Sequence, residues 1–177
     1  MTKLYLVRHG ETYDNARQIL QGQMQGELNE TGIQQACEVR DQMAALHFDA
    51  IVSSDLHRSI HTATIIAEPH HLPVVTTPLL RERDWGDFTG RYIPDMQNVV
   101  WPPNVEAIGP LRERARRFLE FIRNQYPDQQ VLAVGHGIIN KAVQAVYYDK
   151  PMNEVTRMNN GEVRILELTG RVLPPRS

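Results

Sequence analysis

The stretch Leu4-Tyr-Leu-Val-Arg-His-Gly-Glu-Thr-Tyr-Asp-Asn15 decides how the rest of the chain is interpreted. It is a short apolar run that ends in Arg8, His9 and Gly10 and continues into polar residues. An apolar run of this length is typical of a buried strand. In open α/β sheets, ligands bind just beyond the carboxyl ends of such strands. A guanidinium and an imidazole therefore stand where a binding site is expected.

A second segment repeats this pattern. Gln130-Val-Leu-Ala-Val-Gly-His136-Gly137 is again an apolar run that delivers His-Gly at its end. Two parallel strands would bring His9 and His136 side by side, and the glycines let the backbone approach a ligand closely. We expect the two histidines to face one phosphate. Either tripeptide alone is more often an ordinary structural or surface feature, so this interpretation depends on the pattern of the whole chain.

Helical and strand-like segments alternate along the chain. Apolar spacing predicts helices at about 31–46, 56–68, 111–126 and 138–147, strands at 49–54, 73–76 and 163–168, loops at 11–28 and 79–90, and an irregular excursion at 91–110. Strands separated by helices indicate a mostly parallel sheet with helices on both faces. We also expect Asp55 to cap its helix, the tail 173–177 to fray, and a solvated face made of Arg112, Arg114, Arg116 and Arg117.

The composition favours a single domain of ordinary globular type. The 177 residues carry a formal net charge of -2, which gives no reason to expect nucleic acid or a membrane surface as a partner. One cysteine, Cys37, excludes an internal disulfide framework. We see no signal peptide before Leu4 and no apolar run of the roughly 20 residues that a bilayer requires. The expected compartment is therefore the cytoplasm.

Two isolated charges are candidates for chemistry. Arg58 falls in the first turn of a predicted helix, where the helix dipole is already positive, and a bound anion would relieve that conflict. The alternative is a solvated surface arginine. Glu82 lies in a loop without periodicity and is otherwise one more exposed carboxylate. His57 and His61 are four residues apart on a helix, but no third ligand suggests itself, so we expect no metal there.

With these residues in hand, the chain resembles the histidine phosphatase superfamily, also called the phosphoglycerate mutase-like family. The resemblance covers about residues 3–168. Five elements match in order: Arg8-His9-Gly10-Glu11-Thr12 with Asn15; Leu28-Asn-Glu-Thr31-Gly32-x-x-Gln35-Ala36; Ser53-Ser54-x-x-x-Arg58-Ser-x-x-Thr62-Ala63; Leu80-x-Glu82 followed by Trp85-Gly86 and Phe88-x-Gly90; and Val134-Gly135-His136-Gly137. Each piece is weak alone, but the ordered set is specific.

The resemblance implies a three-layer α/β/α sandwich with a mixed, mostly parallel sheet. It implies one domain over residues 1–177, with a short irregular insertion at about 91–110. It also implies roles: His9 as the nucleophile that takes the phosphoryl group, Glu82 as the proton donor and acceptor, and a phosphate pocket made of Arg8, Arg58, His136 and Asn15. Gln21, Gly22 and Gly137 would lie on the substrate side. No cofactor and no metal are implied.

The chemistry explains why these residue types are needed. The transition state of phosphoryl transfer spreads negative charge over the equatorial oxygens, and two guanidinium groups can bind those oxygens bidentately. His9 must attack as neutral imidazole, so Arg8 and Arg58 should disfavour its protonation. A hydrogen bond from its other ring nitrogen to a carbonyl would fix the tautomer. The arginines and His136 supply the positive charge that a metal would otherwise provide.

The family contains both phosphatases and mutases. Phosphoglycerate mutases hold a second anionic group with basic residues in the insertion, and residues 86–110 contain only one, Arg91. Hydrolysis of a small phosphorylated metabolite is therefore our first hypothesis, and mutase-type phosphoryl transfer is the second. A catalytically idle binding domain is the third, although all the expected catalytic residues are present. The sequence fixes neither the substrate nor the oligomeric state.

Overall fold

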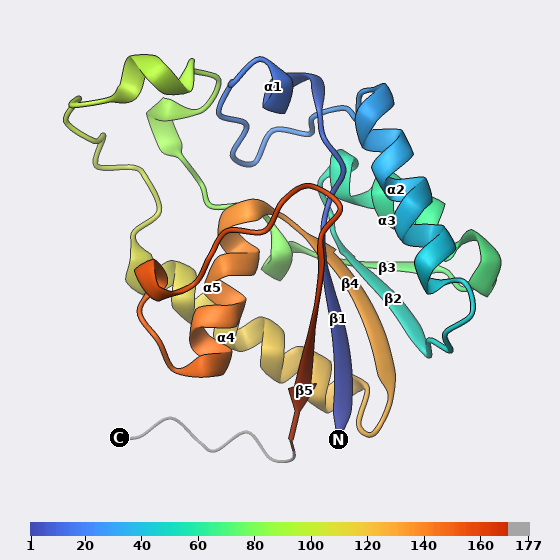
Figure 1. Ribbon diagram of the computed structural model, residues 1–177. Helices are drawn as coiled ribbons and strands as arrows, with labels where there is room; N and C mark the ends of the chain where they lie inside the picture. Colours follow the sequence, from blue (N-terminus) through green and yellow to red (C-terminus); the bar gives the residue numbers. More distant parts are fainter. Residues whose placement is uncertain (170–177) are drawn as a thin grey trace.

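The computed structural model describes residues 1–169. Strands β1, β2, β4 and β3 are mutually parallel, and β5 runs antiparallel beside β1 in the sheet order β3-β2-β4-β1-β5. The elements in chain order are β1 (Thr2–Arg8), α1 (Tyr13–Ala16), α2 (Glu30–Met43), β2 (Ala50–Ser54), α3 (His57–Ala67), β3 (Val74–Thr77), α4 (Ile108–Gln125), β4 (Gln130–Gly135), α5 (Gly137–Tyr148) and β5 (Val163–Leu168). The predicted mixed, mostly parallel α/β architecture is confirmed (Figure 1).

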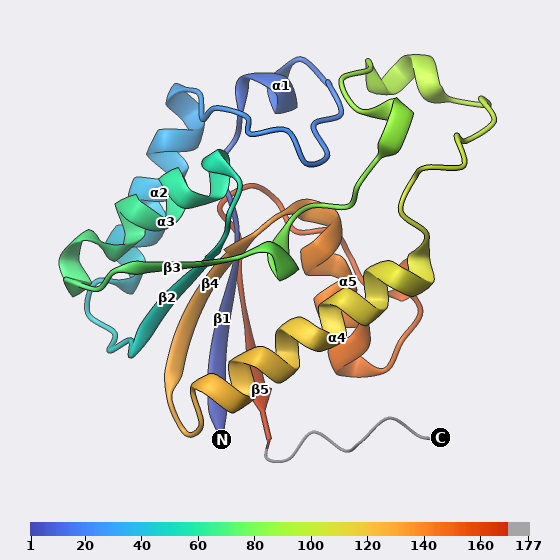
Figure 2. The ribbon, with the colours of Figure 1, turned by 180° about the vertical axis from the view of Figure 1, so that it is seen from behind.

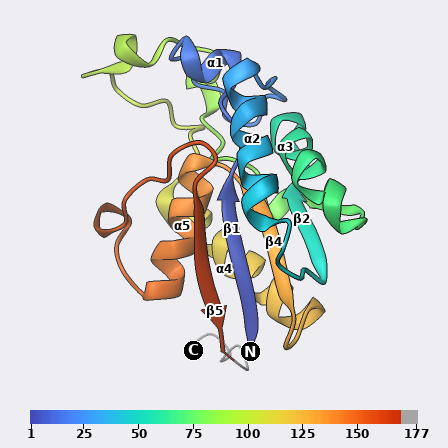
Figure 3. The same ribbon diagram turned by 45° about the vertical axis from the view of Figure 1, so that its right-hand side comes forward.

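The alternation of side chains along the strands builds the three layers. In β1, Leu4 and Leu6 join one buried cluster with α4 and α5, whereas Tyr5 and Val7 join another with α2 and α3. Successive residues of a strand point to opposite faces of its sheet, so one apolar run supplies both clusters. Figure 3 shows the sheet between these two pairs of helices.

Three long connections gather at the carboxyl ends of the parallel strands. They are residues 9–29, which contain α1, residues 81–107, and residues 149–162 between α5 and β5. The first two are joined by backbone hydrogen bonds, because Gly90 N donates to the Leu20 carbonyl and Ile93 N to that of Gln18. Figures 1 and 2 show α1 and residues 91–107 above this end of the sheet, opposite the N-terminus.

The ends of several elements differ from the prediction. The helix α2 stops at Met43 rather than Leu46, and α4 begins at Ile108, inside the segment predicted to be irregular. Pro110 lies in the first turn of α4, where a residue without an N–H breaks no intrahelical hydrogen bond. Proline at this position therefore does not mark a loop. The expectation for the tail 173–177 lies outside the described residues.

The prediction that Asp55 caps α3 is wrong. The N-cap position is Leu56, whose side chain accepts nothing, and Gln25 Oε1 accepts the hydrogen bond from His57 N instead. The Asp55 carboxylate binds Arg81 bidentately, at 2.7 Å from both Nε and a terminal nitrogen, and this contact lowers the pKa of Asp55. The Asp55 carboxylate therefore binds the Arg81 guanidinium instead of the free N–H groups at the start of α3.

No helix within residues 1–169 is long and apolar enough to cross a membrane.

Candidate active site

The two histidines meet at the ends of adjacent strands. β1 and β4 pair in parallel with Arg8 opposite Gly135, so His9 and His136 follow directly on neighbouring strands. Their ring centroids lie 5.0 Å apart at an interplanar angle of 64°. Both side chains are buried. The predicted juxtaposition of these two imidazoles is therefore present.

Hydrogen bonding fixes the tautomer of His9. Its Nδ1 lies 2.7 Å from the Gly10 carbonyl oxygen, which can only accept, so Nδ1 carries the hydrogen and Nε2 keeps its lone pair. Burial, and then the Arg58 and Arg8 guanidinium groups, hold the pKa of His9 well below its usual range. The ring is therefore neutral, as a nucleophilic imidazole must be.

His136 is held from one side by two serines. Its Nε2 lies 2.9 Å from Ser54 Oγ and 3.1 Å from Ser59 Oγ. Ser54 Oγ already accepts from Leu56 N, so its own hydrogen is available to His136 Nε2. That arrangement places the imidazole hydrogen on Nδ1, a buried atom with no hydrogen-bond partner among residues 1–169. Burial and the Arg58 guanidinium lower the pKa of His136 as well.

Two buried arginines flank the histidines. Arg8, the last residue of β1, donates from one terminal nitrogen to the Met158 carbonyl oxygen at 2.7 Å. Arg58, in the first turn of α3, is 1% exposed and donates to the carbonyl oxygens of Gly22, Met24 and Gln25. Burial lowers the pKa of each guanidinium to about 10, so both remain charged at neutral pH.

The electrostatic conflict expected at Arg58 is relieved differently from the prediction. Gln25 accepts hydrogen bonds from the N–H groups of His57 and Arg58, so these two groups of the first turn of α3 are not available to an anion. Carbonyl oxygens of residues 22–25 surround the guanidinium and offset the positive end of the helix dipole. Arg58 still lines the cavity beside His9, where a solvated surface arginine would not be found.

Glu82 lies at the N-terminus of α5. Its Oε1 accepts hydrogen bonds from the N–H groups of Arg83 and Ile139, and its Oε2 accepts one from Ile138 N. The side chain is 7% exposed and lines the same cavity as His9. The carboxylate is therefore fixed in place by main-chain donors, and Oε2 keeps the greater capacity for another hydrogen bond.

The remaining predicted residues divide into two groups. Asn15, Gln21 and Gly22 line the cavity, together with Arg8, His9, Arg58 and Glu82. Asn15 also completes a capping box at α1, accepting from Thr12 N while donating its own N–H to Thr12 Oγ1. His136 and Gly137 are not on the cavity surface, because His136 is buried behind His9 and Gly137 is covered by Arg157.

The cavity has a cationic floor and apolar walls. Its volume is about 360 Å³. The walls come from the loop that contains α1 and from residues 85–101, and their apolar members are Ile19, Leu20, Trp85, Phe88, Ile93, Met96 and Trp101. The single basic residue of the insertion, Arg91, lies 5.8 Å from the Phe88 ring and does not line the cavity. The alcohol portion of a ligand would therefore meet mostly apolar surface.

Sequence reasoning misassigned Arg114 and missed Arg157. Arg114 does not belong to a solvated face, because its guanidinium pairs with Glu106 and donates to the carbonyl oxygens of Leu79, Arg81 and Glu82. Arg157 stands on the cavity wall although its loop has no periodicity. One feature of the sequence could have drawn attention to Arg157. It stands just before the turn-forming run Asn159-Asn160-Gly161, which precedes the last predicted strand.

Residues 1–169 contain no group of three or more His, Cys, Asp or Glu side chains that could hold a metal ion. His57 and His61 do lie together on α3, with ring centroids 5.9 Å apart. Two imidazoles alone fall short of the ligand number that a protein zinc site uses.

Two imidazoles and two guanidinium groups, with a carboxylate beside them, lie together beyond the carboxyl ends of the parallel strands. The family model of the histidine phosphatase superfamily (branch 1) matches residues 4–173, and the chain belongs to this superfamily. A phosphohistidine intermediate is characteristic of the family, and the chain is an enzyme of the histidine phosphatase kind.

Three relatives illustrate the range of this similarity. The uncharacterized phosphatase PhoE of Bacillus subtilis is 36% identical over 90% of this chain and 85% of its own length. The probable phosphoglycerate mutase GpmB of Cronobacter sakazakii is 34% identical over 78% of this chain and 71% of its own. Among solved structures, YhfR of Bacillus stearothermophilus superposes with a TM-score of 0.89 at 28% identity, covering 96% of this chain and 93% of that one.

Proposed function

We propose that the chain hydrolyses phosphomonoesters of small metabolites through a phosphohistidine on His9. The observation that carries this proposal is the state of the His9 ring. It is buried and neutral, Nδ1 is committed to the Gly10 carbonyl, and no hydrogen bond within residues 1–169 engages Nε2. The nitrogen that can attack phosphorus therefore belongs to a ring on the cavity floor between two guanidinium groups.

In the first step, the Nε2 lone pair attacks phosphorus and the bond to the ester oxygen breaks. The developing negative charge on the equatorial oxygens is stabilised by Arg8 and Arg58, which can present paired N–H donors. The Asn15 side chain completes the phosphate pocket at the cavity surface, and the buried His136 supports it from behind His9. The leaving oxygen takes a proton from Glu82. Oε2 is the oxygen suited to carry this proton, because it accepts only one main-chain hydrogen bond whereas Oε1 accepts two.

In the second step, Glu82 acts as a base. It takes a proton from a water molecule, whose oxygen attacks phosphorus, and the bond to Nε2 breaks to release inorganic phosphate. His9 returns to its neutral form, and Glu82 holds the proton needed for the next cycle. Dividing one difficult displacement into two easier ones is the usual gain of covalent catalysis. Gln21 and Gly22 bound the substrate side without taking part in either step, and Gly137 lies beneath Arg157 rather than on the cavity surface.

The walls of the cavity favour hydrolysis over mutase chemistry. A mutase must hold a bisphosphorylated intermediate, yet the insertion contributes Ile93, Met96 and Trp101 to the cavity rather than cations. Mutase-type transfer remains the second hypothesis because of relatives such as the Cronobacter sakazakii protein. Conversion of 3-phosphoglycerate to 2-phosphoglycerate, measured with and without a bisphosphorylated primer, distinguishes the two.

The decisive experiment is a labelling assay with p-nitrophenyl phosphate turnover beside it. We expect the wild type to release p-nitrophenol between pH 5 and 8 and to trap an acid-labile phosphoryl group on His9 after a rapid quench. His9→Ala should lose both signals, because no second nucleophile lies on the cavity floor. His57→Ala, at an exposed histidine, should keep them. Turnover retained by His9→Ala would refute the mechanism, and an inactive wild type would favour the idle binding domain.

A further inference from the structure

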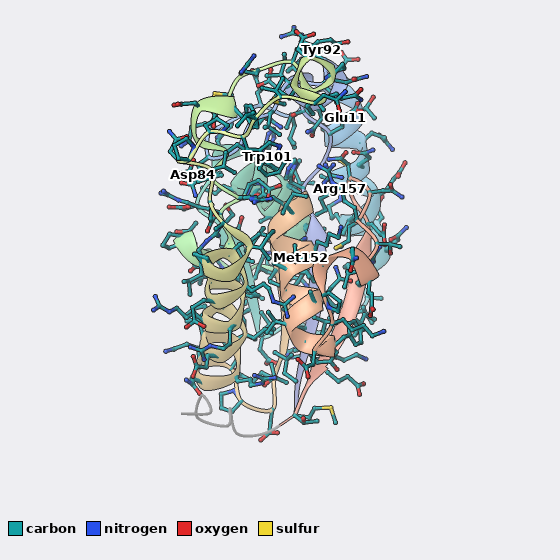
Figure 4. All side chains as sticks on the ribbon, turned by 90° about the vertical axis from the view of Figure 1, so that its left-hand side faces the viewer. Glu11, Asp84, Tyr92, Trp101, Met152 and Arg157 are labelled. Atoms are coloured by element: carbon teal, nitrogen blue, oxygen red, sulfur yellow. The ribbon has the colours of Figure 1, made fainter. Side chains whose placement is uncertain are left out.

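The loop between α5 and β5 brings a third guanidinium to the phosphate cavity. Arg157 lines this cavity and also a second one of about 330 Å³, which shares Arg8 and Asn15 with the first. Its guanidinium lies against the first residue of α5, because a Cβ added at Gly137 would be 2.7 Å from Arg157 Nε. Figure 4 shows Arg157 and Trp101 at the same end of the molecule, next to the N-terminal end of α5.

Arg157 forms no ion pair with any residue in the described range 1–169. No hydrogen bond and no ion pair engages its side chain within residues 1–169, although the other arginines around the site are held by carbonyls or carboxylates. Arg157 lowers the pKa of Arg8 more than any other charged neighbour does, and it also lowers that of His9. The guanidinium therefore lies within electrostatic reach of the phosphate position and at the positive end of the α5 dipole.

The charges around the cavity indicate which ligand group would balance the Arg157 guanidinium. A phosphomonoester dianion carries about two negative charges, which Arg8 and Arg58 balance. When Glu82 holds the proton that it donates, it is neutral and cannot compensate Arg157. Among the residues that line the first cavity, one positive charge is then left, that of Arg157. A single carboxylate matches that charge, whereas a second phosphate would exceed it.

We propose that Arg157 binds a carboxylate on the alcohol portion of the substrate, so that the preferred substrate is a phosphorylated hydroxy acid rather than a phosphorylated neutral alcohol. The proposal rests on the proposed function. It also places the second anion site on the α5–β5 loop rather than on the insertion, in which Arg91 is the only basic residue. Guanidinium suits a carboxylate because it presents paired N–H donors in one plane.

The test compares two ligands that differ only in this group, 3-phosphoglycerate and sn-glycerol 3-phosphate. Inhibition constants against p-nitrophenyl phosphate should show that the wild type prefers 3-phosphoglycerate by about tenfold, as one partly exposed charged contact supplies. Arg157→Gln should abolish the preference while changing the constant for sn-glycerol 3-phosphate less than about twofold. Arg157→Lys should keep part of it. Raising the salt from 0.05 to 0.5 M should reduce it.

Arg117→Gln is the matched control, because it removes one positive charge from an exposed residue of α4. It should leave the preference intact. Equal affinity of the wild type for the two ligands, or an equal loss of both in Arg157→Gln, would overturn the proposal. Calorimetric titration of the same ligands into His9→Ala gives the preference without turnover. A persisting preference in a protein that hydrolyses nothing would refute the proposed function alone, and a phosphohistidine-forming enzyme without the preference would refute this inference alone.

Discussion

At the scale of single residues, Glu82 is the group whose role can be measured most directly. Glu82→Gln cannot donate a proton, so kcat/KM for sn-glycerol 3-phosphate, with its poor leaving group, should fall by about 100-fold or more. The loss for p-nitrophenyl phosphate should be less than about tenfold, because nitrophenolate leaves without protonation. The comparison uses kcat/KM since this constant reports the step that forms the phosphohistidine.

Glu38→Gln supplies the control for this substitution, on the exposed face of α2. It should change neither constant. Losses of equal size for the two substrates in Glu82→Gln would mean that Glu82 only supports the N-terminus of α5, where it accepts hydrogen bonds from Ile138 and Ile139.

At the scale of elements, α4 positions the segment that carries Glu82. The Arg114 guanidinium of α4 donates to the carbonyl oxygens of Leu79, Arg81 and Glu82, and it also forms an ion pair with the Glu106 carboxylate. Lysine keeps the charge but cannot span these acceptors, so Arg114→Lys should lower kcat/KM for sn-glycerol 3-phosphate by about tenfold. Inhibition by inorganic phosphate should change less than about twofold, because Arg8 and Arg58 are untouched.

The same substitution at Arg116, which pairs with Glu113 and Glu120 on the solvent side of α4, is the matched control and should be silent. A parallel loss of phosphate affinity in Arg114→Lys would show a general disturbance of the fold and would contradict a positioning role.

At the scale of the whole molecule, the two buried histidines make the fold sensitive to mild acid. Their pKa values are lowered in the folded state, so below about pH 6.5 the unfolded chain binds more protons than the native one. Stability therefore falls as the pH falls, with a slope approaching about 2.7 kcal/mol per pH unit for two protons. Urea unfolding at pH 7.5, 6.5 and 5.5, in buffers without phosphate or sulfate, measures this slope.

Removing one of the two groups should remove about half of the slope. His9→Gln tests this, and His57→Gln, at an exposed histidine, should leave the slope unchanged. A free energy of unfolding that stays constant from pH 7.5 to 5.5 in the wild type would contradict buried, neutral imidazoles.

Local patterns predicted much of this molecule. The runs that end in His9 and His136 could be identified as strands because burial on both faces demands continuous apolar sequence. Asp55 was misassigned because a capping rule considers only neighbours in sequence, whereas its partner Arg81 lies 26 residues away. Arg157 was missed for the same reason, because the turn-forming residues after it do not indicate that the loop returns to a cavity built by residues distant in sequence.

The carboxyl end of β1 is held in place by residues 158–161. Arg8 donates to the Met158 carbonyl, Gly161 N donates to the Arg8 carbonyl, and Asn160 donates to the His9 carbonyl at 3.0 Å. During synthesis on the ribosome, both histidines emerge before these anchors do. We therefore expect an interrupted translation product that ends before Met158 to lack these three anchors at the end of β1.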